Sequence, residues 1–183
     1  KSDLQRPLSE RLSAGYSEKN VFINKTSGSS GDPMTFAKDK FCHAMIWANI
    51  LRRWNWYGID YNTSLQARFY GRTLDVVAGL KLKLKDILSR RHRFDIFDFS
   101  DAAMDKMLRT FKTKKFDYIN GYTNSIVLLA KHLRSKNIIL KDICPTLKVC
   151  ITTSEMLFDD DQKLLEKWLG VPIVNAYGAA QLD

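Results

Sequence analysis

Apolar residues recur every three or four positions in several parts of the chain, which is the spacing of a helix packed on one side. This pattern predicts helices at residues 40–56, 101–111, 125–133 and 159–169, and a short amphipathic helix near the start that contains Leu4, Leu8 and Leu12. Asp39 and Ser100 stand where helix N-caps are expected. Gly58 and Gly170 stand where two of these helices should end.

Shorter apolar or alternating runs predict strands. They lie at residues 21–23, 34–36, 64–70, 116–122, 147–152 and 171–175. The run from Gly71 to Phe94 is ambiguous, because Leu80, Leu84 and Leu88 fit a helical stripe whereas Leu80, Leu82 and Leu84 alternate as in a strand. We predict a helix there because the run is long.

Strands alternate with helices through the second half of the chain. This order predicts an α/β fold with a mainly parallel sheet and flanking helices. Ligands of such folds bind beyond the carboxyl ends of the strands. Three loops that follow predicted strands are rich in small or polar residues, and we expect them to share one crevice. They are Thr26–Pro33, Thr152–Met156 and Ala176–Gln181.

Composition is that of a globular protein with one hydrophobic core. The chain has 183 residues, of which 45% are hydrophobic and 27% charged, so we expect a single domain, residues 1–183, rather than a disordered chain. No apolar run approaches the ~18 residues needed to cross a bilayer, and we expect a cytoplasmic protein. Three cysteines without CxxC spacing argue against a disulfide framework or a zinc site, and we expect all three to be buried.

The net charge of +9 favours anionic partners without choosing among them. Basic residues cluster between Lys81 and Arg93, in "KLKLK" and "SRRHR". This cluster is either a solvated helix face or a surface that attracts a polyanion, a coenzyme A phosphate or an anionic membrane. No nucleic-acid-binding motif is present, so we expect no specific nucleic-acid partner.

The stretch "TSGSSGDP", from Thr26 to Pro33, has the chemistry of an oxyanion-binding loop. Gly28 and Gly31 allow backbone conformations in which successive amides form a concavity for phosphate oxygens. Hydroxyl side chains add further donors. The Gly-Lys-[Ser/Thr] ending of a Walker A loop is absent. On composition alone, an ordinary surface turn is the alternative.

The order of residues in this loop resembles the phosphate-binding signature of the adenylate-forming (acyl- and aryl-activating) ligase superfamily. Two further motifs of that superfamily follow in the expected order: "ITTSEML" from Ile151 to Leu157, and "NAYGAAQLD" from Asn175 to Asp183. Between the "TSGSSGDP" loop and these two motifs, "FDYINGYTNSIVLLAKHL" is similar to the phenylacetate–coenzyme A ligase branch. Within that branch the chain is most similar to capsular-polysaccharide-biosynthesis and coenzyme F390 synthetase-like proteins.

The resemblance implies a role for several groups of residues. The β- and γ-phosphates of ATP would be held by Thr26, Ser27, Gly28, Ser29, Ser30 and Gly31. The adenine would be bordered by Ser154, Glu155, Ala176, Tyr177 and Gly178. The pocket for a small carboxylic acid would be walled by Gly121, Tyr122 and Thr123. ATP and Mg²⁺ would be required, and coenzyme A is a candidate acceptor.

Two departures from the family pattern affect these implications. Gln181 stands where the family has a Glu that helps to hold Mg²⁺, and an amide oxygen lacks the charge that this cation prefers. The chain also stops before the ribose-binding Asp and before the smaller carboxyl-terminal domain with its catalytic Lys. We therefore expect a fragment of the ATP- and acid-binding domain that is inactive alone.

The resemblance thus implies ATP-dependent activation of a carboxylic acid as an acyl-adenylate, followed by transfer to a thiol or amine, in surface or capsular polysaccharide biosynthesis. Gln181 keeps open a catalytically degenerate nucleotide-binding or scaffold protein of polysaccharide assembly. The basic charge keeps open a polyanion-binding module. Binding to a polyanion should weaken steeply with added salt, whereas specific ATP binding should not.

Overall fold

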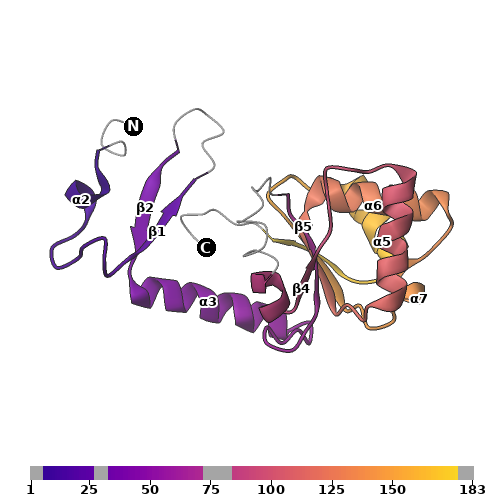
Figure 1. Ribbon diagram of the computed structural model, residues 1–183, viewed down its shortest axis with the longest axis horizontal. Coiled ribbons are helices and arrows are strands. Elements are labelled where there is room, and N and C mark those ends of the chain that lie inside the picture. Colours follow the sequence, from indigo (N-terminus) through magenta and orange to yellow (C-terminus); the bar gives the residue numbers. More distant parts are fainter. Residues whose placement is uncertain (1–5, 27–32, 72–83, 177–183) are drawn as a thin grey trace. The chain divides into compact units, whose positions relative to one another are not determined.

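The computed structural model describes residues 6–26, 33–71 and 84–176. The described chain divides into two compact units, and the division falls within helix α3 (Lys40–Asn55), between Arg53 and Trp54. Figure 1 shows both units. We describe each unit by itself.

The amino-terminal unit contains an antiparallel strand pair. Strand β1 (Phe22–Lys25) pairs with β2 (Thr35–Lys38), so the two strands predicted on either side of the "TSGSSGDP" loop are confirmed. Helix α2 (Leu8–Arg11) is a single turn, shorter than the predicted amphipathic helix. The predicted N-cap of α3 is confirmed, because Asp39 Oδ1 accepts a hydrogen bond from the Cys42 amide at 2.7 Å.

The second unit is built on a five-stranded sheet whose neighbouring strands are all parallel. Its order is β4 (Arg91–Arg93), β3 (Gln66–Phe69), β5 (Tyr118–Tyr122), β6 (Val149–Thr153) and β7 (Ile173–Ala176). The predicted α/β class with a mainly parallel sheet is confirmed.

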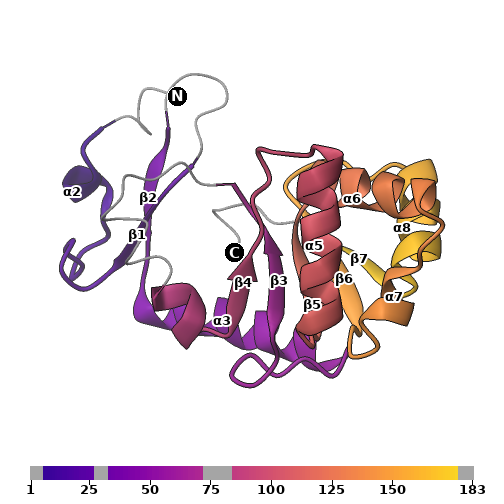
Figure 2. The ribbon, with the colours of Figure 1, turned by 45° about the vertical axis from the view of Figure 1, so that its right-hand side comes forward.

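Four helices of this unit lie together beside the sheet, as Figure 2 shows. They are α5 (Asp101–Thr113), α6 (Thr123–Ser135), α7 (Leu140–Ile143) and α8 (Asp159–Leu169). Their apolar sides pack on the sheet face that carries Phe69, Ile119 and Cys150, and this forms the main core. Ser100 caps α5 by accepting from the Ala103 amide, and Gly170 ends α8 with a φ of 68°, both as predicted.

The opposite face of the sheet changes in character from one side to the other. Near β5, β6 and β7 it is apolar, where Tyr118, Val149 and Ile151 form a second small core with Ile59. Trp54 covers this core, with its ring 5.6 Å from that of Tyr118. Near β3 and β4 the same face is basic, because it carries Arg68 of β3 and Arg91 and Arg93 of β4.

The segment from Gly71 to Phe94 differs from the single predicted helix. Residues 84–88 are helical, residues 72–83 lie outside the described residues, and Arg91–Arg93 form strand β4. Arg90 turns the chain with a φ of 50°, and its carbonyl accepts from the Gln66 amide at 2.9 Å. Residues 91–93 pair with the open edge of β3 although they follow a sequence with helical periodicity. This pairing satisfies backbone N–H and C=O groups of both strands.

Two further expectations concern burial. Cys144 and Cys150 are buried as predicted, but Cys42 is exposed on α3, so the prediction that all three cysteines are buried is wrong for Cys42. Among the described residues, no helix is both long enough and apolar enough to span a bilayer.

Candidate functional site

The carboxyl ends of strands β5, β6 and β7 bring together residues that the sequence analysis singled out. Tyr122, the last residue of β5, is opposite Thr153 on β6, and Thr153 is opposite Ala176 on β7. The predicted acid-pocket residues therefore lie at the same edge of the sheet as the predicted adenine-side residues. Tyr177, Gly178 and Gln181 lie outside the described residues.

Hydrogen bonds join the loop after β6 to the start of helix α6. The Thr123 hydroxyl donates to the Glu155 carbonyl at 3.2 Å and lies 3.5 Å from the Thr153 carbonyl. The Asn124 amide donates to Glu155 Oε2 at 2.7 Å. A carboxylate at a helix N-terminus is stabilised by the free amides and by the helix dipole. Thr123 and Glu155 therefore hold the two predicted walls of the site together.

Ser154, between these contacts, adopts the left-handed conformation with a φ of 72°. A serine in this region is strained, and such strain persists only where surrounding contacts enforce it. The side chains of Ser154 and Glu155 are both exposed, whereas Thr123 is buried. The side chains of Ser154 and Glu155 therefore face solvent. The backbone of their loop is held by the hydrogen bond from the buried Thr123 hydroxyl.

Gly121 is required by the packing of β5 against β3. A Cβ atom at this position would lie 2.4 Å from both the carbonyl oxygen and the Cβ of Phe69, and these atoms cannot move without breaking the strand pair. The close approach of β5 and β3 therefore explains by itself why residue 121 is glycine. The sequence analysis assigned the same residue to the acid pocket.

Tyr122 belongs to an aromatic and polar group, centred on Tyr70, that the sequence analysis did not identify. The Tyr122 ring meets the Tyr70 ring edge-on at 4.9 Å. The Tyr70 hydroxyl donates to Asn120 Oδ1 at 2.8 Å, and burial raises the pKa of Tyr70 to about 12. Asn120 is itself buried. Because Asn120 and Tyr122 alternate along β5, strand periodicity is the signal that would have placed them on one face.

Thr26 closes the base of the predicted phosphate loop. Its amide donates to the Met34 carbonyl at 3.0 Å, and its hydroxyl accepts from the Met34 amide at 2.9 Å. Ser27, Gly28, Ser29, Ser30 and Gly31 lie outside the described residues. Among the residues that are described, no group of three or more His, Cys, Asp or Glu side chains is placed to hold a metal ion.

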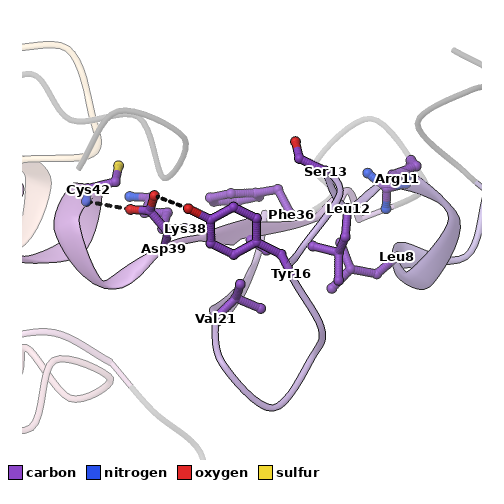
Figure 3. Close-up of a pocket in the computed structure, with 11 residues that line it drawn as sticks. Leu8, Arg11, Leu12, Ser13, Tyr16, Val21, Phe36, Lys38, Asp39 and Cys42 are labelled. Carbon is purple, nitrogen blue, oxygen red and sulfur yellow. Dashed lines mark hydrogen bonds between the residues drawn. The ribbon is translucent and has the colours of Figure 1, made fainter.

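The amino-terminal unit has a pocket of about 370 Å³ that contains none of the predicted site residues (Figure 3). Leu8, Leu12 and Phe36 supply its apolar lining. On its polar side the Tyr16 hydroxyl donates to Asp39 Oδ2 at 3.1 Å. This hydrogen bond and the charge of Asp39 raise the pKa of Tyr16. A second cavity, of about 550 Å³, lies between β4 and α5 and also contains none of the predicted site residues.

No protein-family profile and no curated protein sequence matches the chain. Solved structures do match it. An open conformation of 2-hydroxyisobutyryl-CoA ligase, in complex with 2-HIB-AMP and CoA, superposes with a TM-score of 0.57 at 17% identity, over 94% of this chain and 37% of that protein. ATP-bound MatB from Rhodopseudomonas palustris matches with a TM-score of 0.54 at 15% identity, over 86% of this chain and 29% of MatB.

A third solved structure, VinN with L-aspartate, matches with a TM-score of 0.52 at 15% identity, over 92% of this chain and 40% of VinN. At these identities the likeness establishes the fold. The chain spans less than half the length of each of these solved proteins. It therefore has the fold of part of an adenylate-forming ligase.

Proposed function

We propose that the chain is part of an enzyme that activates a carboxylic acid with ATP as an acyl-adenylate and then transfers the acyl group to a thiol or amine. One observation carries the proposal. In the fold of an adenylate-forming ligase, Tyr122 and Thr123, Ser154 and Glu155, and Ala176 meet at the carboxyl edge of one sheet. Ligand sites of parallel sheets lie at this edge.

The proposed reaction assigns a part to each group of residues. An oxygen of the acid carboxylate bonds to the α-phosphorus of ATP, the bond from that phosphorus to the bridging oxygen breaks, and pyrophosphate leaves with the electron pair. The acyl group then passes to the acceptor with release of AMP. Backbone amides and hydroxyls of residues 26–31 would neutralise the leaving pyrophosphate without a protein nucleophile.

The two sides of the ligand would be held by different strands. Gly121, Tyr122 and Thr123 would wall the acid, and the buried position of Thr123 keeps that wall fixed against the loop of Ser154 and Glu155. Ala176, Tyr177 and Gly178 would border the adenine from β7. Orientation of carboxylate and phosphate in a near-attack geometry is the main catalytic contribution expected of such a site.

Mg²⁺ would add charge neutralisation at the triphosphate when it binds. Gln181 is the residue of this chain that we propose to contribute, through its amide oxygen, a hard-ligand type that suits this cation. The absence of a charge on Gln181 predicts weaker metal binding than a Glu would give.

Finer assignments are part of the same proposal. We place the chain in the phenylacetate–coenzyme A ligase branch, with a role in capsular polysaccharide biosynthesis, a cytoplasmic location and coenzyme A as a candidate acceptor. The 2-hydroxyisobutyryl-CoA ligase and MatB, whose structures hold CoA and ATP respectively, support nucleotide and coenzyme A as ligands. We also propose that residues 1–183 are a fragment of the ATP- and acid-binding domain.

Gln181 supports a second candidate, a nucleotide-binding relative that has lost catalysis and acts as a scaffold in polysaccharide assembly. The two candidates share ATP binding and differ in turnover. The third possibility, a polyanion-binding module, has less support, because two arginines of the basic cluster, Arg91 and Arg93, are only partly exposed.

The test is calorimetric titration with Mg²⁺–ATP and AMP, followed by acid-dependent exchange of pyrophosphate into ATP, using the protein at its natural length. Gly31→Val is the binding control, since a branched side chain prevents close approach of a phosphate to the loop. ATP binding with exchange supports the enzyme, and binding without exchange for any acid supports the scaffold. Failure of ATP to bind the natural-length protein would overturn both.

A further inference from the structure

Three arginine side chains lie side by side on strands β3 and β4. In the register of this pair, Gln66 is opposite Arg91 and Arg68 is opposite Arg93. Alternate residues of a strand point to the same side of a sheet, so Arg68, Arg91 and Arg93 share one face. We call these three residues the arginine face. Two of them belong to the basic cluster of the sequence, where a partly buried strand takes the place of the predicted helix.

Among the described residues, one carboxylate, that of Asp86, forms a salt bridge with the arginine face. Asp86 accepts from Nε of Arg93 at 3.0 Å and from Nη2 of Arg93 at 3.3 Å, which is a side-on bidentate ion pair. Arg91 donates to the neutral hydroxyl of Tyr61 at 2.9 Å. Arg68 donates Nη1 to the neutral amide oxygen of Gln66 at 3.2 Å. In the described part of the chain, neither Arg68 nor Arg91 forms a salt bridge, and the carboxylate of Asp86, paired with Arg93, acts on Arg68 only through its charge at longer range.

On the corresponding edge of the Arg68 guanidinium, Nε makes no hydrogen bond among the described residues. This atom is buried, and Nε of Arg91 is likewise buried without a hydrogen-bond acceptor in the described part of the chain. Burial lowers the pKa of Arg68, and the neighbouring charges of Arg91 and Arg93 lower it further. Arginine stays protonated at ordinary pH despite this, so the face retains an uncompensated positive charge that an anion would stabilise.

The arginine face adjoins the proposed acid pocket. The Arg68 guanidinium lies over the Tyr70 ring at 4.4 Å, and the Tyr70 ring meets the Tyr122 ring at 4.9 Å. Arg68 is also opposite Asn120 in the pairing of β3 with β5. Arg68 is thus one aromatic ring away from Tyr122, a residue proposed to wall the acid.

We propose that the activated acid carries a second carboxylate, and that Arg68 binds it. This inference rests on the proposed function and specifies the substrate class of the same site. Arg93 and Asp86 show the geometry, because a ligand carboxylate would use Nε and Nη2 of Arg68 as Asp86 uses those of Arg93. Binding requires the Arg68 side chain to turn or the Tyr70 ring to shift, since Nε is buried.

The experiment compares succinate, glutarate and adipate, each beside the monocarboxylate of equal chain length, as substrates for pyrophosphate exchange by the natural-length protein. We expect a preference of about tenfold to 100-fold in kcat/KM for one of the dicarboxylates, the range of a charge-assisted hydrogen bond. Arg68→Met should remove this preference by lowering kcat/KM for the dicarboxylate toward that of the matched monocarboxylate. Arg68→Lys keeps the charge without the planar fork and should retain part of it.

A second readout does not depend on adenylation. The same dicarboxylate, without ATP, should raise the Tm of the wild type and not that of Arg68→Met, and the matched monocarboxylate should raise neither. Arg109→Met, which removes an exposed charge on α5, is the matched control and should behave as the wild type does.

The outcomes separate the two proposals. Exchange that shows no preference for dicarboxylates, or a preference that survives in Arg68→Met, overturns the assignment of Arg68 and leaves the proposed function standing. A lower Tm for Arg68→Met with unchanged acid preference shows a structural arginine and also overturns it. Absence of exchange with every acid overturns the proposed function and, with it, any substrate role for the bound acid.

Discussion

The carboxylate of Glu155 accepts a hydrogen bond from the backbone amide of Asn124 at 2.7 Å, although 31 positions separate them in the chain. This contact ties the loop after β6 to the first turn of α6. Removing the Glu155 carboxylate should leave the Asn124 amide without this acceptor and the loop without this attachment to α6. We expect Glu155→Ala to lower the free energy of unfolding by about 1 kcal/mol.

Urea denaturation followed by circular dichroism measures this effect. Glu166→Ala is the matched control on α8, where the side chain is exposed and accepts from Gln162 at 2.8 Å. Its cost should stay within about 0.5 kcal/mol. Equal effects of the two substitutions would contradict a special role for Glu155.

Gly121 should tolerate no side chain. A Cβ there would lie 2.4 Å from the carbonyl oxygen of Phe69, so we expect Gly121→Ala to destabilise the protein by about 3 kcal/mol, at the upper end of the cost of overpacking. Gly58→Ala is the control, since its φ of 65° is strained for alanine but the nearest side-chain atom lies 3.9 Å away. That substitution should cost about 1 kcal/mol. Thermal denaturation of both variants tests the difference.

The three cysteines should differ sharply in reactivity. Cys42 is exposed, Cys144 and Cys150 are buried, and burial raises the pKa of the Cys150 thiol. The thiolate is the reacting form, so Cys150 should stay protonated and inert at neutral and mildly alkaline pH. A thiol reagent should modify the native protein at Cys42 alone and all three cysteines in denaturant. Cys42→Ser should abolish the native reaction, and modification of Cys150 in the folded protein would contradict the burial.

Asp105 should contribute stability that is lost in acid. Its hydrogen bond with His132, at 2.9 Å, and the nearby Lys136 lower the pKa of Asp105 below the ordinary value of 3.8. Asp101 also lies 3.4 Å from His132. Because the folded pKa is the lower one, the carboxylate stabilises the fold fully above 3.8, and its contribution disappears as the pH falls through the depressed pKa.

The stability difference between the wild type and Asp105→Asn measures that contribution. It should be positive at pH about 5 and shrink toward zero as the pH falls below the ordinary carboxyl pKa. Chemical denaturation across that range provides the curve. A difference that stays constant down to the lowest pH at which the protein folds would exclude the carboxylate as its source.

Gln181→Glu should strengthen binding of Mg²⁺–ATP if the proposed metal role is right, since a carboxylate supplies the charge that an amide lacks. We expect about a tenfold lower Kd, corresponding to ~1.4 kcal/mol. Gln162→Glu adds the same charge on α8 and should leave the affinity unchanged. A magnesium titration that shows equal ATP affinity for Gln181→Glu and the wild type would contradict the proposal that residue 181 contributes to Mg²⁺ binding.

Most of the local structure follows from patterns in the amino-acid sequence. Helical periodicity placed α5, α6 and α8, and short-range chemistry marked their ends, because Ser100 can satisfy a free amide and Gly170 can adopt a positive φ without strain. The alternation of strands and helices was enough to predict a parallel sheet, since parallel strands require crossovers. It also implied that ligand-binding loops would follow the strands.

The order of the strands, and the side chains that meet across them, depend on long-range contacts that local patterns do not encode. Arg91–Arg93 became a strand because β3 offered an open edge, which no local pattern encodes. The contacts of Glu155 with Asn124 and of Tyr70 with Tyr122 join segments whose proximity follows from strand order and register. Periodicity predicts which face of its helix or strand a residue occupies. Long-range backbone pairing determines which residues of other elements it contacts.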